Sequence, residues 1–200
     1  MPRVGAALRR QDVVEAAVRV IAAHGAAGAT TRRIAAEAGC PLASLHYVFH
    51  TKDDLFQAVF DALLTAQLAP VPAEVQSAPL DQVCSWLLRA EMDWLIAHPE
   101  LARATAELFN WALYNNRSLA IGPYRNVLER SHDLLTRTVV PLPDTRVMQR
   151  VERLLLIQID GLLTSWFAQN DLNQLREDID TVCEAVSAYV RYQLAETLVQ

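Results

Sequence analysis

Apolar residues recur at intervals of three and four along most of this 200-residue chain, which is the period of an α-helix. Glycine, proline and short polar runs interrupt the pattern, and no segment alternates apolar and polar residues as a half-buried strand does. The low glycine content, six residues in all, and the many alanines and leucines also favour helix. The pattern therefore predicts an all-α fold. Its helices are expected at about residues 9–24, 31–38, 42–49, 52–67, 81–97, 99–114, 123–139, 145–169 and 175–198.

Particular residues mark the ends of the short helices near the N-terminus. Thr30 is suited to cap the helix that follows it, and Gly39 is suited to end that helix. Pro41 is expected as the first residue of the next helix, where a missing N–H costs nothing. The stretch TKDD then begins the fourth helix with a capping box, in which Thr51 caps and Asp54 reaches back.

Charge and proline content divide the chain. Residues 1–52 hold seven basic and three acidic residues, whereas residues 53–200 hold eleven basic and twenty acidic ones. A basic head on an acidic body indicates an anionic partner for the head alone. The clearest linker is PVPAEVQSAP, at residues 70–79, with three prolines. We place the boundary after residue 52, which gives an N-terminal domain of residues 1–52 and a larger helical domain of residues 53–200.

The N-terminal domain has the arrangement of a helix-turn-helix unit, because two short helices are joined by a tight turn and follow a longer first helix. The second short helix, at residues 42–49, is the one expected to enter a DNA groove. The side chains expected to face DNA from that helix are Leu42, Ala43, His46 and Tyr47. The side chains suited to phosphate oxygens by a hydroxyl or guanidinium group are Thr31, Ser44, Arg32 and Arg33.

The stretches TTRRIAAEAG (residues 30–39) and ASLHYVFHTKDDL (residues 43–55) resemble the TetR family of bacterial transcriptional regulators in residue type and spacing. The resemblance covers about residues 9–56 and implies a three-helix DNA-binding domain. The phosphate contacts that it implies are those of Thr31, Ser44, Tyr47, Lys52 and His46. The residues that it places near base edges are Arg32, Leu42 and Ala43.

Three residues depart from the family's pattern. Pro41 replaces the common serine before the reading helix, so that the N-cap is weaker or supplied elsewhere, and Ala43 replaces the usual glycine or proline. His46 replaces the first tyrosine of an aromatic pair, so that an imidazole stands where relatives have a phenol. Leu42 and Ala43 have little hydrogen-bonding capacity and suit thymine methyl groups, which leaves Arg32 to find a guanine.

The histidines and cysteines do not favour a metal site. His46 and His50 are four residues apart, as helical ligands can be, but no glutamate follows His46 in the HExxH manner. The three cysteines, Cys40, Cys84 and Cys183, show no CxxC or CxxH spacing. No nucleophile–base pair, paired carboxylates or phosphate loop has a recognisable spacing either. We therefore predict no metal, no cofactor and no enzyme activity.

The last two helices are candidates for a dimer interface. LLLIQIDGLLTSWFAQND, at residues 154–171, resembles the penultimate helix of the family. Its Gly161 costs about 1 kcal/mol relative to alanine, which a close helix–helix contact can offset. The alternative is that both helices are internal core. We favour a four-helix interface between two copies, because its two-fold symmetry is what palindromic half-sites require. The residues predicted at the interface are Leu155, Gly161, Leu162, Val182, Val186 and Tyr189.

Aromatic residues gather in the middle helices, where the resemblance implies an effector cavity. Trp86 and Trp94 share a helix face with Ala90, and a stripe of this kind is also typical of plain core. Such walls suit a hydrophobic or aromatic effector. The residues predicted to bind it are Trp86, Trp94, Phe109 and Tyr114.

We interpret the chain as a cytoplasmic, homodimeric repressor that binds a palindromic DNA operator and responds to a small effector. Two alternatives stay open. The first is an all-α small-molecule-binding protein or enzyme with a vestigial DNA-binding head, and the second is a regulator without any effector. No signal peptide is predicted, because the N-terminus lacks a charged region followed by an apolar run. No membrane span is predicted either, because no apolar run reaches about 18 residues.

Overall fold

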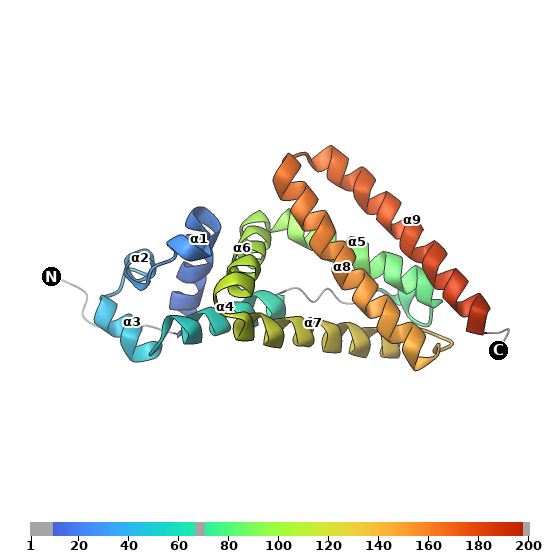
Figure 1. The fold of residues 1–200 in the computed structure, drawn as a ribbon, viewed down its shortest axis with the longest axis horizontal. Helices are drawn as coiled ribbons and strands as arrows, with labels where there is room; N and C mark the ends of the chain where they lie inside the picture. The colour runs from blue at the N-terminus through green and yellow to red at the C-terminus, as the bar shows by residue number, and fades with distance from the viewer. Residues whose placement is uncertain (1–9, 67–70, 198–200) are drawn as a thin grey trace. The chain divides into compact units, whose positions relative to one another are not determined.

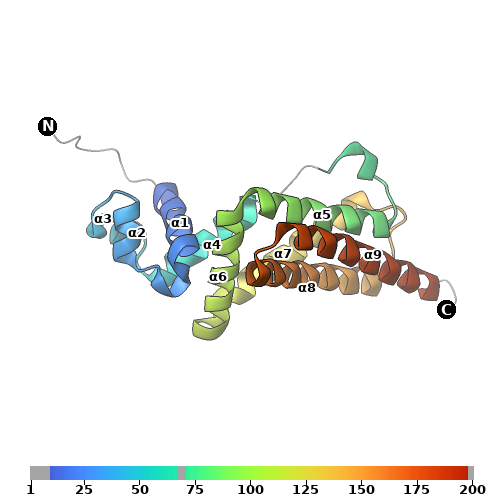
Figure 2. The ribbon, with the colours of Figure 1, turned by 90° about the horizontal axis from the view of Figure 1, so that it is seen from above.

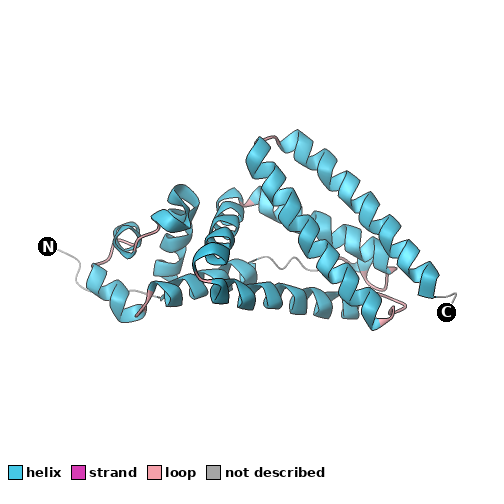
Figure 3. Ribbon diagram, in the orientation of Figure 1, coloured by secondary structure: helices cyan, strands magenta, loops and turns pink. Residues whose placement is uncertain are grey.

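A computed structural model describes residues 10–66 and 71–197, and within these ranges it holds α-helices and one short 3-10 helix but no strand (Figures 1 and 3). The predicted all-α fold, with an N-terminal helix-turn-helix and a C-terminal helical part, is confirmed. The helices are α1 (Arg10–Gly28), α2 (Thr31–Glu37), α3 (Leu42–Val48), α4 (Lys52–Ala66), η1 (Ala73–Val75), α5 (Leu80–Ala97), α6 (Pro99–Asn115), α7 (Arg117–Thr138), α8 (Thr145–Gln169) and α9 (Leu172–Thr197).

The first of two compact units holds the helix-turn-helix. It consists of the described residues of Met1–Ala66 together with His98–Pro123, so that α6 joins α1 to α4. Helix α6 packs against both α1 and α4. The apolar positions predicted from the helical period form its core, and those with no more than 1% of their surface exposed include Val13, Ile21, Ile34, Leu45, Phe56 and Phe60.

The second unit consists of Gln67–Ala97 and Tyr124–Gln200, as far as these residues are described. Helix α9 packs against both α5 and α8, and Figure 2 shows α8 and α9 side by side. The turn between them is possible because Asn170 takes a left-handed conformation, with φ of 54°. The core of this unit includes Cys84, Leu88, Met92, Val151 and Val190.

The structure corrects some helix boundaries. Helix α7 begins at Arg117 rather than near Pro123, so that this proline lies inside the helix instead of opening it. Helix α9 begins at Leu172, because Asp171 accepts hydrogen bonds from the backbone N–H groups of residues 173 and 174. Pro41 is the N-cap of α3 and not its first helical residue.

The predicted helix ends at Arg9, Gln67 and Leu198 lie outside the described residues. The division into residues 1–52 and 53–200 stays a prediction about where each function resides.

Candidate nucleic-acid interface

The turn between α2 and α3 is fixed by local hydrogen bonds. The Thr30 hydroxyl accepts a hydrogen bond from the backbone N–H of Arg33 at 3.2 Å and so caps α2, as predicted. Gly39 has φ of 63°, a left-handed conformation that glycine adopts without strain. The N–H of Cys40 then donates to the carbonyl of Ala35 at 3.0 Å, which closes the turn.

Helix α3 is anchored by its apolar side and exposes the other. Leu45 is fully buried, and Phe49, just after the helix, is 2% exposed. The ring of Phe49 also lies 4.8 Å from the Arg10 guanidinium carbon, which is within reach of a cation–π contact. This packing leaves three side chains of the predicted reading surface exposed, namely Ala43, His46 and Tyr47. Tyr47 is the most exposed of them at 86%.

Two further residues of the predicted surface, Leu42 and Ser44, are half-buried, as is Thr31 on α2. Their expected contacts with DNA stay predictions.

The two adjacent arginines of α2 differ in their surroundings. Arg32 is exposed, whereas the Nη1 of Arg33 donates a hydrogen bond of 2.6 Å to the Gly28 carbonyl. The guanidinium of Arg33 thus stabilises the end of α1. Arg19 of α1 forms an ion pair of 2.7 Å with Glu37 of α2. Arg32 is consequently the better placed of the two to meet an incoming base or phosphate.

The capping box at the start of α4 is present as predicted. The Asp54 carboxylate accepts from the Thr51 N–H, and the Thr51 hydroxyl accepts from the Asp54 N–H, both at 3.0 Å. These two bonds fix the direction of α4 three residues after α3 ends.

Lys52, the only lysine of the chain, is half-buried and makes its contacts within the first unit. Its Nζ donates a hydrogen bond of 3.3 Å to the Ala26 carbonyl, and it lies 4.6 Å from the centre of the Phe56 ring and 5.2 Å from that of Trp111. Burial lowers the pKa of this ammonium, and the charge of Asp53 opposes that effect. These contacts could not be predicted from the sequence, because Ala26 and Trp111 are 26 and 59 positions away from Lys52.

The predicted effector residues do not form one cluster within either unit. Trp86 and Trp94 lie half-buried on α5 of the second unit. Phe109 and Tyr114 lie on α6 of the first unit, where the Phe109 ring packs edge-on against Phe60 with centroids 6.0 Å apart. Tyr114 is 90% exposed. Their role in ligand binding stays a prediction.

Burial raises the pKa of Glu91 on α5 to about 7, against the opposing charge of Arg130 on α7. Glu152 of α8 is 6% exposed and bonded to His132 Nδ1 at 2.7 Å. The apolar pattern of the sequence does not predict these two carboxylates in the interior of the unit.

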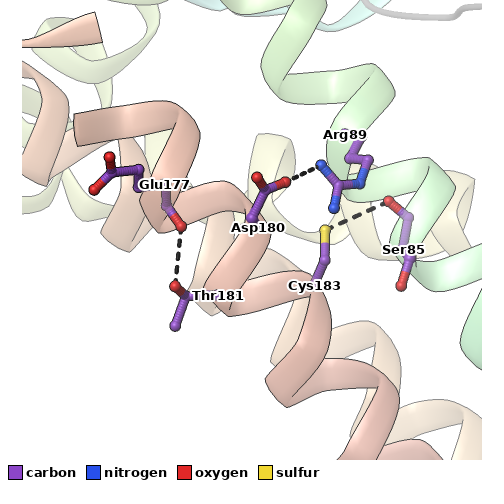
Figure 4. A network of polar contacts seen from close by, with 6 residues as sticks. All are labelled: Ser85, Arg89, Glu177, Asp180, Thr181 and Cys183. Atoms are coloured by element: carbon purple, nitrogen blue, oxygen red, sulfur yellow. Dashed lines mark hydrogen bonds and ion pairs between the residues drawn. The ribbon is translucent and has the colours of Figure 1, made fainter. Parts of the chain in front are cut away.

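Helices α5 and α9 are linked by the polar network of Figure 4. Arg89 forms an ion pair with Asp180, and the Cys183 thiol lies 3.7 Å from the Ser85 carbonyl. On α9 itself, the Thr181 hydroxyl donates to the Glu177 carbonyl at 2.9 Å. The network fixes the register of α9 on α5.

Burial separates the predicted interface residues of α8 and α9 into two groups. Leu155, Leu162 and Val186 are at most 4% exposed within the single chain, so that their partners are the chain's own helices. Val182 and Tyr189 are half-buried, and Gly161 is exposed. A Cβ atom placed on Gly161 would have no neighbour within 4 Å.

The described residues offer neither a set of metal ligands nor a membrane-spanning helix. They contain no group of three or more His, Cys, Asp or Glu side chains arranged to hold a metal ion. None of their helices combines the length and the apolar character that a membrane crossing requires.

Comparison with known proteins yields a family model and several relatives. Residues 13–59 match the model of the bacterial regulatory proteins of the tetR family. The nicotine-responsive transcriptional repressor HdnoR of Paenarthrobacter nicotinovorans is 26% identical over 92% of this chain and 96% of its own length. The transcriptional repressor AcnR of Corynebacterium diphtheriae is 27% identical over 90% and 92%. The crystal structure of BioQ with its double-stranded DNA operator matches the fold with a TM-score of 0.61, at 19% identity over 90% and 99%.

Proposed function

We propose that this chain, which belongs to the TetR family of bacterial regulatory proteins, represses transcription as a homodimer that binds a palindromic operator and leaves it when a small effector binds. The observation that carries the proposal is the exposed face of α3, with its apolar side anchored by Leu45 and Phe49. A short helix held in this way, preceded by α2, is the geometry that enters a major groove. Two relatives that are named transcriptional repressors match this chain over 96% and 92% of their own length, and they support the same role.

Each head would contact DNA through two kinds of residue. Tyr47, His46, Ser44 and Thr31 would bind phosphates and so position the head without reading sequence. Arg32 would reach a guanine, and Leu42 and Ala43 would meet thymine methyl groups. The solved complex of BioQ with its operator supports this expectation by its fold.

A second copy of the chain would cover the outward face of α8 and α9. The exposed residues of these helices include Ile157, Gly161, Ala185, Ala188 and Tyr192. Glycine inside a helix costs about 1 kcal/mol, and no neighbour in the single chain occupies the space beside Gly161. Close approach of a second copy would offset that cost, and a two-fold axis would match inverted half-sites.

The effector would bind within the second unit, where Trp86 and Trp94 offer half-buried aromatic surface. The nicotine-responsive relative supports a small organic molecule with an aromatic part. A library of such compounds, screened for loss of operator binding, tests this part of the proposal. Release by no compound would favour a regulator controlled by its abundance alone.

The DNA-binding part is tested by selecting bound duplexes from a random pool and repeating the selection with Arg32→Ala. The wild-type chain should enrich two inverted half-sites, about one helical turn apart. Arg32→Ala should relax the preference at one or two positions of each half-site, worth about 1–3 kcal/mol per base pair. Unchanged preferences would remove Arg32 from the base-reading set, and the absence of any enriched inverted repeat would overturn the proposed function.

A further inference from the structure

The ammonium of Lys52 holds three helices of the first unit together. It donates to the carbonyl of Ala26 near the end of α1, at 3.3 Å, and faces the rings of Phe56 on its own helix and Trp111 on α6. A carbonyl oxygen and two ring faces are the surroundings that favour a partly desolvated cation. Its charge is thus already compensated within the chain.

The next residue reinforces this attachment. Asn116, at the C-terminal end of α6, donates from its Nδ2 to the Asp53 carboxylate at 2.7 Å. Lys52 and Asp53, consecutive residues of the first turn of α4, are therefore both held by the last turn of α6. Only residues 49–51 separate this turn from α3, and the capping box of Thr51 restricts how they bend.

The same surroundings make Lys52 a poor candidate for a phosphate ligand. A side chain that turned towards DNA would give up its hydrogen bond and both ring contacts. The carboxylates of Asp53 and Asp54, its neighbours in the first turn, would repel the approaching phosphate. Arg32, by contrast, is exposed on α2.

We propose that Lys52 is a positioning residue, which fixes the reading helix α3 relative to α1 and α6 through Ala26 and Trp111 and does not itself bind a phosphate. The proposal rests on the proposed function, since it concerns how the head is presented to DNA. It makes the first turn of α4 one of the attachments that hold α6 to the segment carrying α3.

The first test uses the fact that the chain has a single lysine. Reductive methylation with ¹³C-formaldehyde labels Lys52 and the N-terminal amine, and the lower pKa of the latter distinguishes the two resonances. Ring faces next to the ammonium should shift the dimethyl-lysine signal upfield in the free chain, and Trp111→Leu should reduce that shift. The signal should stay in place when operator DNA is added. An unshifted signal in the free chain, or one that moves only with DNA, would overturn the proposal.

The second test compares Lys52→Met with Arg32→Met, because each variant removes one positive charge from the same head. Lys52→Met should weaken operator binding about tenfold at every salt concentration, with the slope of log K against log[salt] nearly unchanged. Arg32→Met, at a residue expected to meet DNA, should reduce that slope by about 0.9 per head. An equal loss of slope in Lys52→Met would show a phosphate contact and overturn the proposal.

A double-mutant cycle with Trp111→Leu separates positioning from general destabilisation. If Lys52 acts through Trp111, the effects of Lys52→Met and Trp111→Leu on DNA affinity should be clearly less than additive. Additive effects would contradict the inference even if both variants fold normally. A wild-type chain that bound no DNA would overturn the proposed function together with this inference, whereas a slope lost in Lys52→Met would overturn this inference alone.

Discussion

Replacing Gly161 with arginine is expected to convert the proposed dimer into monomers and to lower operator affinity by at least about a hundredfold. Apart from the adjacent residues and the backbone of α8 itself, no described atom lies within 4 Å of a Cβ at this position, so the new side chain has room in an isolated copy. In a dimer across α8 and α9 the same side chain would place two unpaired charges in a closely packed seam. Loss of the dimer would also separate the two reading helices, since each monomer would hold only one half-site.

The matched control is Asn126→Arg, which adds the same charge to an exposed position of α7 in the same unit. Sedimentation equilibrium and circular dichroism are the two measurements. Gly161→Arg should remain helical and become monomeric at concentrations where the control is dimeric. A dimeric Gly161→Arg chain would place the interface elsewhere, and an unfolded one would show that the space beside Gly161 is not open.

The free energy of unfolding is expected to fall by up to about 3 kcal/mol as the pH rises from 4.5 to about 7. The cause is Glu91, whose burial raises its pKa in the folded chain from 4.5 to about 7. The folded state therefore binds this proton more tightly than the unfolded state does. The resulting penalty is absent below pH 4.5, grows between the two pKa values and is complete above about pH 7.

The measurement is urea unfolding at several pH values, for wild type and for Glu91→Gln. Subtracting the two curves cancels the other titrating groups, so that the difference isolates Glu91. Glu91→Gln should be the more stable chain above pH 7, by less than the full 3 kcal/mol because Arg130 loses the attraction of its partner. Parallel curves would show that Glu91 titrates as an exposed carboxyl does.

Short-range features of the head could be predicted from the sequence. The Thr30 cap, the glycine turn at Gly39 and the capping box of Thr51 and Asp54 each depend on residues no more than three positions apart. For the same reason the helices α5, α6 and α8 were located to within a residue or two. Pro123 is misleading, because proline is common at a helix start but here lies inside α7, where it removes one backbone hydrogen bond.

Features that depend on distant contacts could not be predicted. Lys52 looked like a surface cation because its partners, Ala26 and Trp111, are far away along the chain. The apolar stripes of α8 and α9 identified a buried face but not what buries it, and Leu155 and Val186 face the chain's own helices. The sequence predicts a close helix contact at Gly161. Because no other helix of the described chain comes within 4 Å of a Cβ placed at this residue, the contact is expected with a second copy.

The central claim, that the chain is a DNA-binding regulator, is tested most directly by the salt dependence of its binding to the selected operator. If the dimer neutralises about six phosphates, affinity should fall about a thousandfold between about 50 and 200 mM salt, with two chains bound per operator. A matched duplex with scrambled half-sites should bind more weakly at every concentration. A flat response to salt, or equal affinity for both duplexes, would contradict the account.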